Sequence, residues 1–325
     1  MFEIPDLKLR CESAALRTEE WMIKHLSEEK ILSHNIPDPV SYYKWPLTLY
    51  IRGRIHEARE LLKWIMEKSL SENGDLICER SGFHKDFHSY ANLWLVLATI
   101  KLDEVELTDN LLGFLLKHHN QTTGGMITIP TLSNEKTEDP LSTSFLGMAA
   151  CALKDQNIAD LVLKYLHLIF DLQPEHDRFW LRTTPEGDLI SRTVLNEDPK
   201  TYVINIGKHD ESYYFLGAMC FFLASYIEHF GRNILSDNLV NRLKPILERA
   251  GPEALHTIWA AKVAPGCVAL YSVLSDEKFL KLAIPVIDAV LQGQSDEGCW
   301  LKGDKPWVTV SAEQCYWLTF IRSKL

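Results

Sequence analysis

Apolar and polar positions along this chain alternate between two kinds of helical segment. One kind is apolar on almost every side, and its members start near residues 41, 88, 142, 211, 257 and 311. The other kind carries a single apolar stripe at helical spacing and starts near residues 6, 55, 104, 157, 236 and 277. A helix that is apolar all round is buried, whereas a helix with one apolar stripe covers it from outside. The alternation therefore predicts pairs of inner and outer helices.

Six such pairs predict an all-α fold, an (α/α)6 barrel in which an outer ring of helices surrounds an inner ring. We expect the last inner helix to pack against the first outer helix and so close the ring. An open solenoid of helix pairs is the alternative, but its terminal helices need a polar outer face, which this chain lacks. The expected organisation is a single domain over residues 1–325.

A short motif near the C-terminal end of the chain supports a repeating unit. In Gln294-Ser-Asp-Glu-Gly298-Cys-Trp300 the glycine permits a turn at positive φ, and the tryptophan can anchor the loop on the helices. We expect the glutamine side chain to bond to carbonyls left open at a helix end. Weaker copies of this motif lie at Ser71–Leu76 and Gln121–Ile127. A motif that recurs after outer helices indicates a recurring helical hairpin.

Two of the inner helices open on the same pattern, Ser-x-x-Phe-Leu-Gly, at residues 142–147 and 212–217. Serine favours the first turn of a helix, and glycine allows a neighbouring helix to approach closely. An aspartate stands just before each copy, Asp139 and Asp210. We interpret the pattern as a structural signature of these helix starts.

The longest connection, residues 173–208, breaks the helical pattern. The segments 178–182 and 189–193 alternate between apolar and polar residues on either side of the turn at 185–188, which predicts a β-hairpin. Residues 201–206 predict a further strand. A long insertion in a compact fold is typical of a lid or a binding loop.

The composition of the chain argues against some classes of binding partner. The chain is 46% hydrophobic with a net charge of −10, and it lacks the lysine and arginine clusters that bind nucleic acid. Seven scattered cysteines without a Cys-x-x-Cys pair indicate reduced thiols and a cytoplasmic location. We expect no signal peptide and no membrane span, and the sequence leaves the oligomeric state open.

The helical pairing and the Gln-x-x-x-Gly-x-Trp form of residues 294–300 resemble the α/α toroid superfamily of terpenoid cyclases and protein prenyltransferases. Residues 298–306 are also similar to the last repeat of prenyltransferase β subunits. The chain lacks the Asp-x-Asp-Asp acid motif and the Asp-x-Cys…His zinc set of this superfamily, and Glu313 or Gln314 stands where a prenyltransferase carries its histidine. The resemblance implies the architecture and leaves the catalysts open, because fold alone does not decide function.

Side chains capable of chemistry gather at the starts of the predicted inner helices. In a closed ring these starts share one face, and their dipoles and free N–H groups favour a substrate with an anionic or polar end. Acid–base candidates among them are His84, Asp86, His88, His209, Asp210 and Glu211. Expected substrate-binding residues are Tyr42, Trp45, Tyr90, Asp139, Ser142, Trp180, Arg182, Tyr213, Tyr214, His256, Trp259, Glu313 and Tyr316.

These residues favour a cofactor-independent enzyme that carries out an acid–base cyclisation or isomerisation of a mainly apolar small molecule, such as an isoprenoid or polyene precursor. Histidine and aspartate would exchange the proton, while tyrosine and tryptophan would shape the substrate. We expect no metal, since His84-x-Asp86-x-His88 has no second ligand cluster at a recognised spacing.

Two other functions remain open. The first is a carbohydrate-active enzyme of the same six-hairpin architecture (a glycoside hydrolase, lyase or epimerase), with Asp86, Asp139 or Asp210 as acid and base. The second is a binding or scaffold toroid without chemistry.

Overall fold

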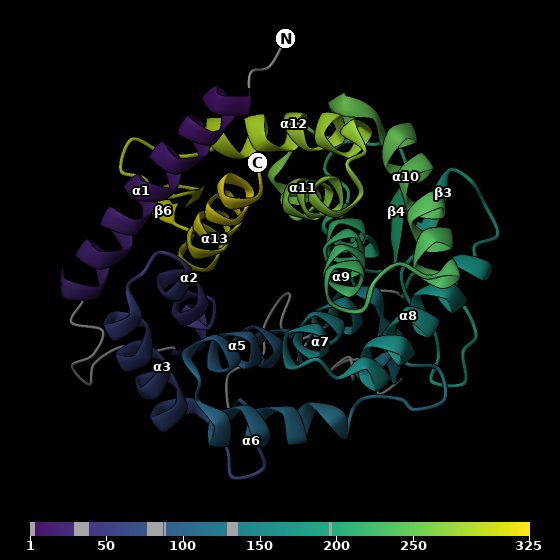
Figure 1. Ribbon diagram of the computed structural model, residues 1–325, viewed down its shortest axis with the longest axis horizontal. Coiled ribbons are helices and arrows are strands. Elements are labelled where there is room, and N and C mark those ends of the chain that lie inside the picture. Colours follow the sequence, from purple (N-terminus) through teal and green to yellow (C-terminus); the bar gives the residue numbers. More distant parts are fainter. Residues whose placement is uncertain (1–3, 29–38, 77–86, 88, 129–135, 195–196) are drawn as a thin grey trace. The chain divides into compact units, whose positions relative to one another are not determined.

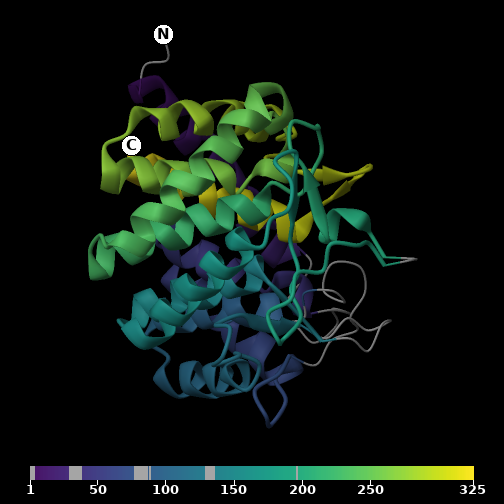
Figure 2. The same cartoon turned by 90° about the vertical axis from the view of Figure 1, so that its right-hand side faces the viewer.

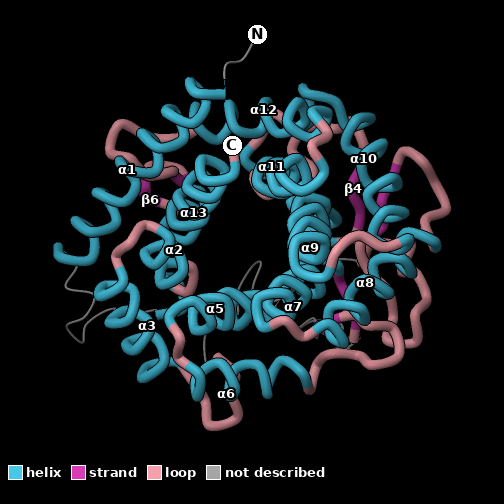
Figure 3. The backbone as a smooth tube through the Cα atoms, in the orientation of Figure 1, coloured by secondary structure: helices cyan, strands magenta, loops and turns pink. Residues whose placement is uncertain are grey.

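The computed structural model describes the chain except for residues 1–3, 29–38, 77–86, 88, 129–135 and 195–196. Within the described residues the chain forms twelve α-helices, and the other regular structure consists of short 3₁₀ turns and three two-stranded sheets (Figure 3). The chain divides into two compact units. Unit 1 holds residues 1–79, 91–114 and 290–325, and unit 2 holds residues 80–90 and 115–289.

Unit 1 brings the two ends of the described chain together. The last helix packs along the first, as predicted, and also contacts the short helix α2 (Figure 1). A thiol–carbonyl contact of 3.4 Å from Cys315 to Ala15 marks how closely the two helices approach. The helices of this unit are α1 (Ile4–Glu28), α2 (Trp45–Ile51), α3 (Ile55–Ser69), most of α5 (Ser89–Leu102) and α6 (Val105–Leu116), and α13 (Val308–Lys324).

Unit 2 contains a row of buried helices. The helices α7, α9 and α11 pack side by side, and α8 and α10 cover α7 and α9 (Figure 1). The buried and covering helices alternate along the chain, as the hydrophobic pattern predicts. The helices of this unit are α7 (Pro140–Leu153), α8 (Gln156–Asp171), α9 (Tyr214–Phe230), α10 (Ile234–Leu255), α11 (Val263–Leu274) and most of α12 (Glu277–Gln292).

Close packing within this row depends on two glycines of the Ser-x-x-Phe-Leu-Gly pattern. A Cβ at Gly147 would lie 2.4 Å from the ring of Phe222 on α9. A Cβ at Gly217 would lie 2.2 Å from the backbone of Lys262 at the start of α11. The interpretation of this pattern as a packing signature is therefore confirmed.

Three predicted helix starts differ from the structure. The segment predicted as one helix over 41–54 is a 3₁₀ turn, η1 (Pro39–Tyr42), followed by α2, whose start at Trp45 suits the early Pro46. The helix predicted from residue 211 begins at Tyr214, because a hydrogen-bonded turn occupies residues 207–213. The helix predicted from 257 opens as the 3₁₀ turn η3 (Ile258–Ala260) before α11.

The connection 173–208 contains the predicted small β insertion with a different pairing. Strand β3 (Arg178–Trp180) pairs antiparallel with β4 (Val203–Asn205). The predicted hairpin with 189–193 is present only as a short antiparallel bridge between Thr183 and Leu189, with Ile190 N–H donating to Arg182 O at 2.9 Å. The expected turn is present, with Thr184 N–H donating to Asp188 O at 2.8 Å. The edge beyond β3 is occupied, because Thr183 exchanges backbone hydrogen bonds with Glu138 of β2. Figure 2 shows β3 and β4 at one end of the helices of unit 2.

The Gln294 motif (residues 294–300) joins the end of α12 to the middle of α1. The side-chain amide of Gln294 donates to Ala14 O and Thr18 Oγ1 of α1, each at 2.9 Å. The indole N–H of Trp300 donates to Val290 O, one of the open carbonyls at the end of α12, at 3.0 Å. The tryptophan therefore binds the helix-end carbonyl that we expected the glutamine to bind, and the glutamine holds the neighbouring helix.

The glycines of the motif and of its two copies have the same role. Gly74, Gly124 and Gly298 have φ values of 88°, 87° and 89°. A Cβ on each would lie 1.9–2.5 Å from a backbone carbonyl oxygen, of α6, α8 and α1 in turn. Only glycine permits both the conformation and the approach. The predicted recurring unit is thus a loop that presses its glycine onto the backbone of a covering helix.

This arrangement predicts the cost of adding a methyl group. Gly298→Ala should lower the free energy of unfolding by about 2–4 kcal/mol, from left-handed strain together with overlap with the Arg17 carbonyl. Gly303→Ala is the matched control, since Gly303 has φ 63° with nothing within 4 Å of the added Cβ, and should cost about 1 kcal/mol. Urea denaturation measures both, and equal losses would contradict the role of the carbonyl contact.

Candidate active site

The buried strand β2 (Thr137–Asp139) and the start of α7 form the centre of the candidate site, which lies entirely in unit 2. Asp139 caps α7, with its Oδ1 accepting from Ser142 N–H at 2.8 Å. Pro140 follows in the first turn, where its missing N–H costs nothing. The Thr143 hydroxyl donates to the backbone oxygen of Asp139 at 2.6 Å. The local sequence Asp-Pro-x-Ser-Thr therefore fixes the carboxyl group of Asp139.

The carboxyl group of Asp139 is inaccessible to solvent and only partly hydrogen-bonded. Its exposed fraction is 0%, and Oδ2 has no hydrogen-bond partner among the described residues. Burial raises the pKa of Asp139, while the positive charge of Arg182 and the Ser142 N–H act in the opposite direction. Burial prevails, so the group takes up a proton more readily than an ordinary aspartate. A carboxyl of this kind is suited to proton donation.

Arg182, which comes from the connection after α8, is held against β2 by neutral groups. Its Nε donates to Thr201 O at 3.0 Å and its Nη1 to Thr137 Oγ1 at 2.8 Å. The faces of its guanidinium group lie against the rings of Phe87 and Tyr202, at 4.9 and 4.8 Å. Arg182 is fully buried, and its Nη2 has no hydrogen-bond partner in the described part of the chain.

Aromatic side chains continue from Arg182 around the start of α9 and α7. Phe87 lies edge-on to Phe215, with 5.5 Å between ring centres, and Phe215 stacks on Tyr214 at 4.7 Å. Tyr90 packs edge-on against Phe145 of α7 at 5.0 Å. These contacts place rings from three separate segments of unit 2 in one group.

A second buried cation connects the aromatic groups. The ammonium group of Lys262, at the start of α11, lies 5.1 Å from the ring centre of Tyr214 and 5.5 Å from that of Tyr90. Burial raises the pKa of Tyr214, which therefore stays neutral beside this cation. Ser142 and Ser144 on α7 are fully buried, and their hydroxyl groups have no hydrogen-bond partner among the described residues.

We call this set the Asp139 cluster. It combines one protonatable carboxyl, two buried cations, the hydroxyl of Ser142 and a lining of aromatic rings. Its members are Asp139, Ser142, Arg182, Lys262, Phe87, Tyr90, Phe145, Tyr202, Tyr214 and Phe215.

The neighbouring carboxylate, Glu138, faces the other side of β2 because side chains alternate along a strand. Its Oε1 accepts from Asn120 Nδ2 at 2.7 Å and from Thr123 Oγ1 at 2.6 Å. Its Oε2 accepts from Thr183 Oγ1 at 3.1 Å. Burial raises the pKa of Glu138, and these three donors oppose the rise. Glu138 thus joins the loop after α6 to the connection after α8 and is not available to a ligand in this arrangement.

The predicted acid–base groups divide into two sets. His84, Asp86 and His88 lie outside the described residues, so their role stays a prediction. His209 and Asp210 contact each other at 3.1 Å, but their side chains are 56% and 50% exposed. Partial burial acts to raise the pKa of Asp210, yet the Thr257 hydroxyl and His209 outweigh it and lower the pKa. Asp210 is therefore not a raised-pKa acid, and the structure gives no support to a role for it as the proton donor.

Glu211 and Tyr213 stabilise the turn before α9. The carboxylate of Glu211 accepts from the backbone N–H and the side-chain amide of Asn205, at 3.2 and 3.0 Å. The hydroxyl of Tyr213 accepts from Gly207 N–H at 2.9 Å and donates to Lys208 O at 3.0 Å. Burial raises the pKa of Tyr213 to about 12. Glu211 and Asp210 have different partners and do not form the acid pair that their adjacency suggested.

The structure brings together five of the predicted substrate-binding residues in the Asp139 cluster and disperses the others of unit 2. Trp180 is buried in β3, whereas Trp259 is 42% exposed and His256 lies at the surface. The five clustered residues are Tyr90, Asp139, Ser142, Arg182 and Tyr214.

Unit 1 holds the remaining predicted residues in a separate set. Tyr42 and Trp45 pack edge to face at 5.1 Å, and Tyr316 lies edge-on to Trp94 at 5.4 Å. Glu313 is buried in an ion pair with Lys44 and accepts from the indole N–H of Trp317 at 3.1 Å. Because Glu313 already has a cation and a second hydrogen-bond donor, it needs no ligand. This set of residues therefore indicates function less strongly than the Asp139 cluster does.

Sequence reasoning missed both buried lysines, Lys44 and Lys262. Each stands at the N-cap position of an apolar helix, and a proline follows within three residues. A cation at a helix N-terminus opposes the helix dipole, so a lysine directly before an apolar helix is a usable signal. The sequence pattern does not show that both side chains are buried, which the structure establishes.

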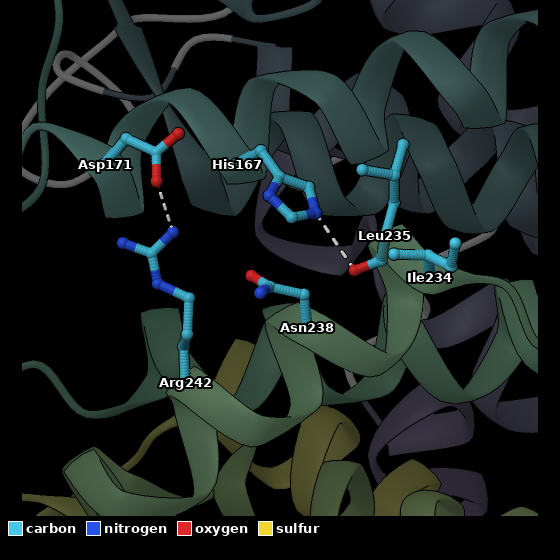
Figure 4. A pocket seen from close by; sticks show the side chains of 6 residues that line it. All are labelled: His167, Asp171, Ile234, Leu235, Asn238 and Arg242. Atoms are coloured by element: carbon cyan, nitrogen blue, oxygen red, sulfur yellow. Dashed lines mark hydrogen bonds and ion pairs between the residues drawn. The ribbon is translucent and has the colours of Figure 1, made fainter.

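A groove on unit 2 lies away from all these residues (Figure 4). It has a volume of about 410 Å³ and is wide open. Its polar groups satisfy one another, since Arg242 pairs with Asp171 and His167 Nε2 contacts Leu235 O at 2.9 Å. It offers no acid–base group without a partner. The groove lies between α8 and α10 and is lined by His167, Asp171, Ile234, Leu235, Asn238 and Arg242.

Metal-ion clusters and membrane-spanning helices are both absent from the described part of the chain. It contains no group of three or more histidine, cysteine, aspartate or glutamate residues placed to hold a metal ion. None of its helices combines the length and the apolar character that crossing a membrane requires.

Comparison with known proteins yields similarity of structure alone. No protein-family model matches the chain, and no curated protein matches it by sequence. A variant of the type II terpene cyclase MstE from Scytonema, in complex with merosterolic acid A, superposes with a TM-score of 0.59 and 12% identity, covering 98% of this chain and 99% of the other.

Two sugar-active enzymes superpose equally well. An unsaturated glucuronyl hydrolase specific for heparin has a TM-score of 0.62 and 10% identity, over 97% of this chain and 96% of the other. A sugar epimerase from a ruminal bacterium has a TM-score of 0.56 and 13% identity, over 86% and 87%. The chain therefore has the α/α toroid fold of terpenoid cyclases and of these hydrolases and epimerases, as its helix pattern predicts. At such low identity the likeness establishes the fold and not the reaction.

The buried hydroxyl groups at the start of α7 give a test of stability. Ser144→Ala should leave the free energy of unfolding unchanged or raise it by about 0.5–1 kcal/mol, because it removes a buried polar group without a partner. Thr143→Val is the matched control, since it removes a hydroxyl that donates to Asp139 O and accepts from Met126 N–H. This change should cost about 1–3 kcal/mol. Urea denaturation of both variants would contradict the assignment if Ser144→Ala lost as much as Thr143→Val.

Proposed function

We propose that this protein is an enzyme of the terpenoid-cyclase type, which isomerises or cyclises a mainly apolar polyene by acid–base chemistry at the Asp139 cluster. The observation that carries the proposal is the carboxyl of Asp139, which is fully buried, has a raised pKa and keeps one oxygen without a partner among the described residues. Ionisable groups perturbed by burial and a specific charge are concentrated at functional sites.

The surroundings of Asp139 suit an apolar substrate. Aromatic rings dominate the cluster, and their faces attract the positive charge that develops when a double bond or an epoxide accepts a proton. Tyr90 and Tyr214 belong to this lining, and the raised pKa of Tyr214 keeps it neutral during such a step. A dry, aromatic setting also protects a cationic intermediate from water.

The proton balance of the reaction is simple. The protonated carboxyl of Asp139 gives its proton to the basic end of a polarised double bond or to an epoxide oxygen. The electron pair of a neighbouring double bond then forms the new carbon–carbon bond. Loss of a proton from the adjacent carbon to the Asp139 carboxylate restores the acid, so the product is an isomer of the substrate.

Structural similarity supports the proposal without deciding it. The cyclase MstE appears among the similar structures in complex with a substrate named geranylgeranyl dihydroxybenzoate, which joins a polyprenyl chain to an acidic ring. A carbohydrate-active enzyme would need a second carboxylate to act with Asp139. Glu138 lies on the other face of β2 with three donors of its own, and Asp86 lies outside the described residues.

Substitution of Asp139 tests the proposal. Asp139→Asn keeps the helix cap and removes the acid, so turnover of a polyprenyl substrate should fall about 10²–10⁴-fold. The wild-type rate should decline as pH rises through the raised pKa of Asp139, because only the protonated form donates. Gas chromatography with mass spectrometry follows the reaction as new isomers of unchanged mass.

Asp155→Asn is the matched control, because Asp155 caps the next helix, α8, through Ile158 N–H at 3.1 Å and should not affect turnover. Asp139→Asn should also retain its stability at neutral pH, since a neutral amide avoids the burial of a charge. Full turnover in the folded Asp139→Asn variant would reject this acid. If the wild type instead releases reducing sugars from a polysaccharide, the carbohydrate alternative holds.

A further inference from the structure

We infer that His209 is the centre of a pH-sensitive clasp, which ties the turn before α9 to the start of α11 only while both nitrogens of its ring carry a proton. We call this group the His209 clasp. It consists of Lys200, His209, Asp210, His256 and Thr257, all in unit 2. The inference concerns the conformation of these segments, and it does not depend on the reaction proposed for the Asp139 cluster.

The ring of His209 lies between two acceptor groups. Its Nε2 contacts the backbone oxygen of His256 at 3.2 Å, and its Nδ1 contacts Oδ2 of Asp210 at 3.1 Å. A carbonyl oxygen only accepts, so the contact at Nε2 needs an N–H. The lowered pKa of Asp210 keeps its carboxyl group ionised, so the contact at Nδ1 needs an N–H as well. Both contacts are therefore hydrogen bonds only when the imidazole is protonated.

The His209 clasp joins three segments that are distant along the chain. Asp210 belongs to the turn before α9, and Thr257, between α10 and α11, donates from its hydroxyl to Asp210 Oδ1 at 2.8 Å. Lys200 of the 3₁₀ turn η2 (Pro199–Thr201) donates from Nζ to Asp210 O at 2.8 Å. One short turn thus holds both the connection 173–208 and the start of α11.

The backbone of Asp210 indicates that these contacts hold the turn in place. Asp210 has a φ of 60°, in the left-handed region that is unfavourable for residues with a Cβ. The other non-glycine residues with positive φ in the described part of the chain, Asp103, Lys154 and Ser275, directly follow α-helices, where this conformation commonly ends a helix. Asp210 instead precedes a helix, so its conformation depends on the contacts of its own side chain and carbonyl group.

Loss of one proton removes one of the two contacts of His209. A neutral imidazole has a single N–H, so it can donate to His256 O or to Asp210 but not to both. Histidine is the side chain whose charge ordinarily changes between about pH 5 and 8. We therefore expect the clasp to be closed in mild acid, where Asp210 is still ionised, and to weaken as the pH rises through that range.

The charges around the clasp favour this direction. The carboxylate of Asp210 contacts the ring directly and stabilises the imidazolium form. Lys200 opposes it from the backbone side of Asp210. Glu211, the next acidic residue, has its carboxylate on the backbone N–H and side-chain amide of Asn205. Among these charged groups Asp210 alone contacts the imidazole, so its attraction decides.

Release of the clasp would affect segments that carry the Asp139 cluster. Tyr214 begins α9 shortly after Asp210, and Lys262 directly precedes α11. Thr201, the neighbour of Lys200, accepts from Nε of Arg182 at 3.0 Å. The protonation of a surface histidine is thereby linked to the order of a buried group.

Amide hydrogen exchange at about pH 5.5 and about pH 8.5, corrected for the intrinsic effect of pH, tests the inference. The amides of Ala260 and Ala261, which donate to Thr257 O and Ile258 O at 3.1 Å, report on the start of α11. Their protection should fall about two- to fivefold between the two pH values, the size expected for one exposed charge-assisted contact. Unchanged protection in the wild type overturns the inference.

Variants assign the effect to His209. His209→Gln cannot take up a proton and should abolish the pH dependence of protection. Asp210→Asn should reduce it, because asparagine tolerates the left-handed backbone but lacks the charge. His256→Ala is the matched control, since the clasp uses only the backbone oxygen of His256 and its side chain is exposed. A pH dependence that persists in His209→Gln, or that disappears in His256→Ala, overturns the inference.

The inference and the proposed function can fail separately, because exchange is measured without a substrate. If protection changes as expected but Asp139→Asn retains full turnover, the clasp stands and the acid is wrong. If turnover requires Asp139 but protection does not change with pH, the reaction stands and the clasp is wrong.

Discussion

Three consecutive polar residues, Thr137, Glu138 and Asp139, are buried in the short strand β2, and each of them must find a partner inside the protein. This constraint organises unit 2. Glu138 takes its donors from the loop after α6 and from the inserted connection. Thr137 accepts from Arg182, and Asp139 caps α7. The connection after α8 and the start of a buried helix therefore meet at one strand.

The two faces of β2 differ in how completely they are satisfied. On the Glu138 face each carboxylate oxygen receives a hydrogen bond, so this face has a structural role. On the other face Asp139 keeps an oxygen, and Arg182 a nitrogen, without a partner among the described residues. The carboxylate on one face of the strand thus has its hydrogen-bond partners within the protein. The other face keeps polar groups that a ligand can bind. This difference separates the proposed site from ordinary buried polar structure.

Unit 1 contains a comparable buried lysine that is paired with a carboxylate. Lys44 is also a buried lysine at the N-cap of an apolar helix, and Glu313 forms an ion pair with it. The comparison explains why Glu313 and Tyr316, which sequence reasoning placed among the substrate-binding residues, carry a weaker indication than Arg182. A buried cation with its own carboxylate needs no further anion.

The sequence by itself determined the helices, their alternation, the glycine loops and the cap at Asp139. These features depend on spacing, on positive φ and on capping over a few residues, so a local pattern is enough to predict them. The sequence also pointed to Tyr90, Ser142 and Tyr214, since polar and aromatic residues at the starts of apolar helices are conspicuous. It pointed to Arg182 as a cation in the long insertion.

Only the tertiary structure decided which of these residues act together. The contact of Arg182 with Thr137 spans 45 positions. Strand β3 likewise takes the distant strand β4 as its partner, and the local hairpin keeps only the bridge between Thr183 and Leu189. Whether a carboxyl gains or loses protons also depends on burial and on partners distant in sequence. The pKa is therefore raised at Asp139 and lowered at Asp210, although each aspartate precedes a copy of the same sequence pattern. A sequence pattern shows where a polar residue lies along the chain. The folded structure determines its hydrogen-bond partners and its exposure to solvent.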